Sequence, residues 1–188
     1  KLVPRKYAFD RENFVKEMQD LMKVETSYVG KFPHVEGSHC LEVCIFDVHL
    51  GKMAWAPESG ENYDNKIAQE RFFTALEKFI RLAETFNVEK ILFPFGNDFF
   101  NSDIDSPYPQ TTRGTPQQND LRWQKSFKMG CEMIIKAVNR LKEIAPVELK
   151  GVPGNHDHHK TFYLGEVLEV RYENDENVIV DNSPSTTK

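Results

Sequence analysis

The sequence has few cysteines and lacks any long apolar segment. Only three cysteines, Cys40, Cys44 and Cys131, occur among 188 residues, and none of their spacings is typical of a zinc site. An odd number of thiols is typical of a reducing compartment, so we expect a cytoplasmic protein without a disulfide framework. No apolar run approaches the roughly 18 residues that a membrane span needs, and no secretion signal is visible. We therefore expect a soluble, processed or excised piece with no membrane partner.

Positive charge is also scarce. Lysine and arginine number 24 against 29 acidic residues, which gives a net charge of -5 and a pI near 5.7. Domains that bind nucleic acid usually carry a basic stripe, so a nucleic-acid substrate would need local contacts here. An acidic net charge also fits a site that is rich in carboxylates and whose charge is balanced when cations bind.

The length suits one α/β domain preceded by an extension. We expect residues 1–40 to form an N-terminal helix, starting at Asp10, and a loop, and residues 41–188 to form the domain. Strand-length apolar runs occur at 41–48, 88–95, 147–152 and 177–180. Helical periodicity occurs at 64–87, at 119–144 and beyond Lys160. Strands that alternate with helices predict an α/β fold with a parallel sheet.

Polar residues follow the first three expected strands. Asp47 and His49 end the first, Asp98 and Asn101 follow the second, and Asn155 and His156 follow the third. Since the carboxyl ends of parallel strands share one edge of a sheet, these side chains should gather in one cleft. Side chains alternate along a strand, so Asp47 and His49 should point to the same side.

Two simpler interpretations of these residues stay open. His49 could form only a hydrogen bond with Asp47. The last loop could be a solvated turn in which Asn155 and Asp157 bond to local backbone groups.

The three polar blocks, taken in order, resemble those of the calcineurin-like metallophosphoesterases. The sequence blocks of that family are Asp-x-His, then Gly-Asp-x-x-Asp/Asn, then Gly-Asn-His-Asp/Glu. Residues 47–49, 98–101 and 154–157 match these blocks. The resemblance covers about residues 41–182, and the loop 96–123 also resembles phage-encoded members. It implies a layered α-β-β-α sandwich, of which this chain holds mainly the N-terminal βαβαβ half.

The resemblance also implies roles for individual residues. Asp47 and His49 would bind one metal ion, Asp98 would bridge two ions, and Asn155 would bind the second. Two Mn²⁺ ions are expected, with Fe or Zn as alternatives, and they would clamp a phosphate and activate a water for attack on phosphorus. His156 would act as general acid on the leaving oxygen, so the implied function is metal-dependent hydrolysis of phosphoester bonds.

Two further residues are candidates near this site. Asn101 occupies a position where many relatives have an aspartate that orients the catalytic histidine. An amide could hold the His156 ring but not stabilise its cation, so we expect a less basic His156. Arg113, in the long loop 102–119, is a candidate phosphate contact, and the alternative is an arginine that is only solvated.

The chain departs from the family pattern in two ways. Asn97 is an extra residue in the second block, which leaves Asp103 and Asp105 as rival ligands to Asp98. All six histidines lie at or before His159, so the later metal-binding histidines of the family are absent. His158 and His159 are candidate substitutes, although they closely follow the catalytic block. We therefore expect the N-terminal portion of a longer phosphoesterase.

Two classes of function follow. In the first, the chain hydrolyses phosphodiesters or phosphomonoesters, and the aromatic side chains of Phe99, Phe100 and Trp123 make DNA a candidate substrate through base stacking. In the second, the chain is a catalytically incompetent domain of the same fold that serves as an interaction or structural module.

Overall fold

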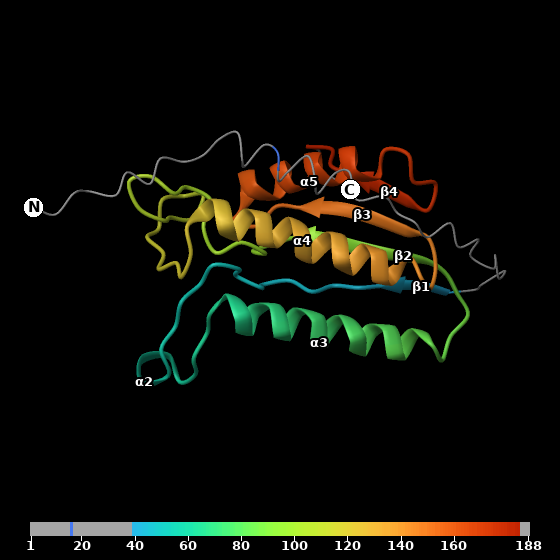
Figure 1. Cartoon of the computed structure of the whole chain (residues 1–188), viewed down its shortest axis with the longest axis horizontal. Coiled ribbons are helices and arrows are strands. Elements are labelled where there is room, and N and C mark those ends of the chain that lie inside the picture. Colours follow the sequence, from blue (N-terminus) through green and yellow to red (C-terminus); the bar gives the residue numbers. More distant parts are fainter. Residues whose placement is uncertain (1–15, 17–38, 185–188) are drawn as a thin grey trace, which may run out of the picture.

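A computed structural model describes residue 16 and residues 39–184, and Figure 1 shows its elements. Four parallel strands form one sheet in the order β1-β2-β3-β4. The strands are β1 (His39–Glu42), β2 (Val88–Gly96), β3 (Val147–Val152) and β4 (Val178–Asp181). The helices are α2 (Ala56–Ser59), α3 (Asn65–Ala83), α4 (Trp123–Leu141) and α5 (His158–Tyr172). The α/β class is confirmed, whereas the helix expected from Asp10 lies outside the described residues, except for Lys16.

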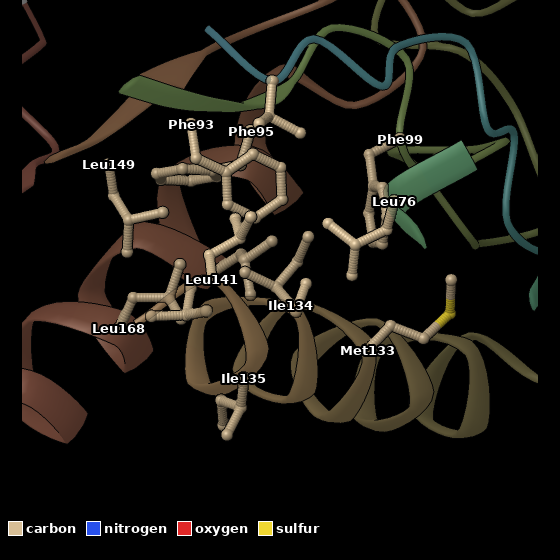
Figure 2. Close-up of a cluster of buried hydrophobic side chains, with 14 of the residues drawn as sticks. Leu76, Phe93, Phe95, Phe99, Met133, Ile134, Ile135, Leu141, Leu149 and Leu168 are labelled. Atoms are coloured by element: carbon tan, nitrogen blue, oxygen red, sulfur yellow. The ribbon is translucent and has the colours of Figure 1, made fainter. Parts of the chain in front are cut away.

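The core lies on one face of the sheet. Alternate residues of β3 are buried, namely Val147, Leu149 and Gly151, because successive strand side chains point to opposite faces. Phe93 pairs with Leu149 in the β2–β3 register, so these side chains lie on the same face. Figure 2 shows them in one cluster with side chains of α3, α4 and α5. These helices therefore cover the same face, and fully burying each large side chain contributes about 1.5–3 kcal/mol.

Helix α3 follows local sequence signals closely. The side chain of Asp64 caps its first turn by accepting a hydrogen bond from the Ile67 amide at 2.8 Å. Its buried residues then recur at helical spacing: Ala68, Phe72, Leu76, Ile80 and Ala83.

Strand β1 is shorter than the sequence predicts. It ends at Glu42, although the chain continues alongside β2, with the Asp47 amide bonded to the Asn97 carbonyl at 3.1 Å. Asp47 and His49 both have left-handed backbone conformations, with φ of 55° and 46°. The prediction that strand alternation places these two side chains was therefore wrong, because neither residue is in a strand.

Helix α5 begins earlier than expected. The buried carboxylate of Asp103 accepts hydrogen bonds from the amides of His159 and Lys160 at 3.0 Å, in the first turn. These amides have no partner within the helix, so the distant loop caps it. None of the helices in the described part of the chain is both long and apolar enough to cross a bilayer.

Candidate metal centre

The loops after β2 and β3 meet through the side chain of Asp157, which is fully buried. Its carboxylate accepts hydrogen bonds from the backbone amides of Asp98, Phe100 and Gly154, at 3.0–3.1 Å. Burial raises the pKa of this carboxyl group, and the three N–H donors act in the opposite direction. Asp157 thus joins the two loops. The sequence places Asp157 in the matching block but did not predict this role.

Asp98 is held against the Gly154 loop. Its Oδ1 accepts a hydrogen bond from the backbone amide of His156 at 2.8 Å. A β-carbon at position 154 would lie 2.1 Å from the same oxygen, so this approach requires glycine.

Three of the predicted site residues converge. His49, Asp98 and His156 each offer one potential ligand atom, and these atoms lie within 4.8 Å of one another. Within residues 39–184 this is the one group of three or more His, Cys, Asp or Glu side chains found at such distances. The centroids of the two imidazole rings are 4.6 Å apart, in an edge-to-face arrangement. Three strand-end loops, distant in sequence, therefore contribute to one cluster.

Asp47 lies next to this cluster but is not part of it. Its Oδ1 is 3.7 Å from His49 Nε2, beyond hydrogen-bonding distance, and its side chain is 71% exposed. A simple Asp47–His49 hydrogen bond is therefore not formed. The role of Asp47 as a metal ligand stays a prediction.

The environment of His49 fits a metal ligand. Its Nδ1 is buried and has no hydrogen-bond partner among the described residues. Burial lowers the pKa of the imidazole, and the neighbouring His156 lowers it further, while the Asp98 carboxylate raises it. A neutral imidazole keeps a lone pair, as metal binding requires. Nitrogen and carboxylate donors together suit a divalent transition metal.

The ring of His156 is oriented by the backbone of Asn101. His156 Nδ1 lies 2.9 Å from the Asn101 carbonyl, which can only accept, so Nδ1 carries the proton and Nε2 is free to exchange one. The side-chain amide of Asn101 instead donates to the Gln118 carbonyl and to Asn119 Oδ1. The predicted contact through the Asn101 amide was therefore wrong, because this buried side chain faces the long loop.

Asn155 and Arg113 lie on neighbouring segments. The Asn155 side chain is exposed, and its carbonyl accepts a hydrogen bond from the Thr112 amide at 3.1 Å. Arg113 is also exposed and directly follows Thr112, so the long loop brings it beside the block that contains His156. Their predicted roles, metal binding for Asn155 and phosphate binding for Arg113, stay predictions.

The rival ligands have other partners. Asp103 caps α5, as described above, and Asp105 forms an ion pair with Lys160 at 2.7 Å. His159 Nδ1 lies 3.0 Å from the Asp103 carboxylate, and His158 is exposed. None of these four residues belongs to the cluster of His49, Asp98 and His156.

Strained backbone is concentrated at this site. Among the described residues, four that are not glycine have left-handed φ angles: Asp47, His49, Asn97 and Asp98. Such conformations cost about 1–3 kcal/mol each and persist only where the surrounding structure enforces them. Backbone strain is thus stored in the two segments that carry His49 and Asp98.

The aromatic side chains proposed for base stacking differ in exposure. Phe99 and Phe100 are each only 1% exposed and pack in the core, so their predicted role was wrong. Trp123 is 39% exposed and is available to a ligand.

The fold and the cluster together define an α/β domain with a candidate His–Asp–His metal centre at the carboxyl edge of its parallel sheet. Comparison of the chain with protein-family models, curated proteins and solved structures found no match in any of the three.

Proposed function

We propose that this chain is a metallophosphoesterase, which hydrolyses phosphoester bonds with the help of divalent metal ions. The observation that carries the proposal is the approach of His49, Asp98 and His156 within 4.8 Å of one another. Each residue comes from a different block of the sequence that resembles this family. Parallel α/β sheets bind ligands at the same edge.

The metal ions would be held mainly by His49 and Asp98. Asp47 and Asn155 would complete the ligands of two Mn²⁺ ions, although nitrogen and oxygen donors also suit Fe and Zn. When bound, the ions supply Lewis acidity and an activated water for in-line attack on phosphorus.

The chain itself would manage the proton of the leaving group. His156 donates Nδ1–H to the Asn101 carbonyl, which fixes the orientation of the ring. Its Nε2 would then deliver a proton to the leaving oxygen, a contribution typically worth about 10²–10⁴-fold in rate. Arg113 would bind a phosphate oxygen from the adjoining loop.

As for the fold, we place the described domain as one α-β half of an α-β-β-α sandwich. The second sheet would pack on the face opposite the helices, where β3 presents Glu148 and Lys150, each partly exposed. These two charges pair with each other at 3.4 Å, which reduces the cost of covering them.

Metal binding and hydrolysis can be measured separately. We expect calorimetric titration with Mn²⁺ to show binding and bis-p-nitrophenyl phosphate to be hydrolysed in its presence. Asp98→Ala should abolish both, whereas Glu89→Ala, which removes an exposed carboxylate of β2, should change neither. His156→Gln should keep Mn²⁺ binding and lose about 10²–10⁴-fold in kcat if the ring is the general acid. Hydrolysis that survives Asp98→Ala would refute the proposal.

One observation favours the second candidate, an interaction module without catalysis. Asp47 is 71% exposed and lies outside the cluster, which leaves three convergent donors. Mn²⁺ binding without hydrolysis of mononucleotides, DNA or bis-p-nitrophenyl phosphate would support this candidate instead.

A further inference from the structure

A cavity lies between the start of the long loop after β2 and the helices α4 and α5. It has a volume of about 470 Å³, which is within the roughly 300–1,000 Å³ of typical ligand pockets. Residues 103–106, α4 and α5 line it. We call it the Trp123–Tyr163 cavity after its two most exposed aromatic side chains.

These aromatic side chains are unusually accessible. Trp123 at the start of α4 is 39% exposed, and Tyr163 of α5 is 56% exposed, although both line the same cavity. Ile104 and Phe127 add apolar surface between them. Exposed aromatic rings beside apolar walls offer π faces on which a planar ring can stack.

The polar lining of the cavity selects among planar ligands. Lys160 donates to the Ser102 carbonyl at 2.6 Å and forms an ion pair with Asp105 at 2.7 Å, so its positive charge is already neutralised within the protein. The Asp105 side chain is 15% exposed, and its other oxygen accepts one bond, from the Ser102 hydroxyl. A carboxylate oxygen has further lone pairs for N–H donors and repels a phosphate.

We propose that the Trp123–Tyr163 cavity binds a nucleobase, stacked on the aromatic side chains, whose amino group donates to Asp105. Adenine, cytosine and guanine carry such an exocyclic amino group, and thymine does not. A phenylalanine side chain of a partner protein fits less well, since it has no donor for this carboxylate, and aromatic peptides serve as the competing ligand in the test.

This inference rests on the proposed function, because it names the substrate class of the same site. The Asn101 carbonyl accepts a hydrogen bond from His156, and the carbonyl of the next residue, Ser102, accepts one from Lys160. Two consecutive residues, Asn101 and Ser102, thus link the metal centre to the cavity. A nucleotide whose base fills the cavity would carry its phosphate toward His156.

Base dependence can be tested without cleavage. Fluorescence anisotropy in EDTA would measure the binding of a fluorescein-labelled single-stranded oligodeoxycytidylate and of an abasic oligomer of equal length. We expect the abasic oligomer to bind at least about tenfold more weakly, and Trp123→Ala and Tyr163→Ala each to weaken oligodeoxycytidylate binding about tenfold. Trp55→Ala, which removes the other tryptophan, also exposed, is the matched control and should have no effect.

Two further measurements identify the ligand more closely. Competition by dCMP would show whether a free nucleotide suffices or an oligomer is needed. Asp105→Asn keeps an oxygen for Lys160 and should reduce a roughly tenfold preference for oligodeoxycytidylate over oligothymidylate.

Equal binding of the abasic oligomer, no effect of either aromatic substitution, or binding of aromatic peptides alone would overturn the inference. Wild-type titration with Mn²⁺ separates it from the proposed function. A chain that binds Mn²⁺ and hydrolyses phosphoesters without base dependence refutes the nucleobase site alone. A chain that binds the base but no Mn²⁺ refutes the metallophosphoesterase alone.

Discussion

The contact between Gly154 and Asp98 predicts that a single added methyl group disrupts the candidate metal centre. A β-carbon at position 154 would lie 2.1 Å from Asp98 Oδ1 and 2.4 Å from its backbone nitrogen. The side chain of Asp98 cannot relieve the second clash by rotating, and the Asp157 carboxylate holds that nitrogen in place. Gly154→Ala must therefore push the two loops apart.

The expected loss of stability follows from two terms. Separation of the loops breaks the bond from the His156 amide to Asp98, worth about 1.5–3 kcal/mol because its acceptor is charged. Forcing an extra carbon into packed surroundings costs about 1–3 kcal/mol more. A total of roughly 2.5–6 kcal/mol corresponds to a fall in Tm of about 5–24 °C for a chain of this size.

Gly60→Ala is the matched control, because Gly60 has a left-handed φ of 87° and an added β-carbon there would meet nothing within 4 Å. It should cost only the backbone strain, about 1 kcal/mol. Thermal unfolding followed by circular dichroism would compare the variants, and titration calorimetry would measure Mn²⁺ affinity. If Gly154→Ala unfolds at the temperature of Gly60→Ala and binds Mn²⁺ like the wild type, the reasoning from this contact is wrong.

Four other predictions test separate parts of the structure. Asp103→Ala removes the acceptor that caps α5 and should lower the free energy of unfolding by about 2–4 kcal/mol in urea titrations; an unchanged midpoint would contradict the cap. Burial raises the pKa of the Cys131 thiol from 9.0 to about 12, so the unfolded chain loses this proton first. The free energy of unfolding should therefore fall between pH 9 and 12, by up to about 1.4 kcal/mol per pH unit, and Cys131→Ala should make this slope shallower. Equal slopes for the wild type and Cys131→Ala would contradict the raised pKa of Cys131. Arg113→Ala should raise KM for a phosphoester about threefold to tenfold without changing kcat. An unchanged KM would show that Arg113 is a solvated side chain that does not bind phosphate. Asn101→Asp should shift the pH–rate profile little, because the Asn101 side chain does not contact His156; a large shift would mean that the side chain reaches the ring.

Elements with strong local signals were predictable from sequence. Strand β3, Val147–Val152, has the predicted bounds, since a segment with alternating apolar residues lies between Pro146 and a polar turn. Helix α3 begins after Asp64 as expected, because the cap and the apolar period lie within the same segment. The convergence of His49, Asp98 and His156 at one edge also followed from the alternation of strands and helices.

Features that depend on contacts between distant segments were not predictable. The apolar run 41–48 reads as one strand, yet the left-handed conformations of Asp47 and His49 have no signature in hydrophobicity. The start of α5 depends on Asp103, which lies far away in the sequence. The family resemblance implied that the side chain of Asn101 orients His156, whereas a backbone carbonyl, present in every residue type, provides this contact.

Asp157 explains how the strained loops can persist. The four left-handed residues together cost about 4–12 kcal/mol, at about 1–3 kcal/mol each. The three amide bonds to the Asp157 carboxylate contribute about 1.5–3 kcal/mol each, which is of similar size before the cost of burying the charge. Two of these bonds hold the amides of Asp98 and Phe100, on the strained side, and the third holds Gly154, on the side of His156. Asp157 would therefore act as a positioning residue, because it fixes the distance between the segment that carries Asp98, the candidate metal ligand, and the segment that carries His156, the candidate general acid.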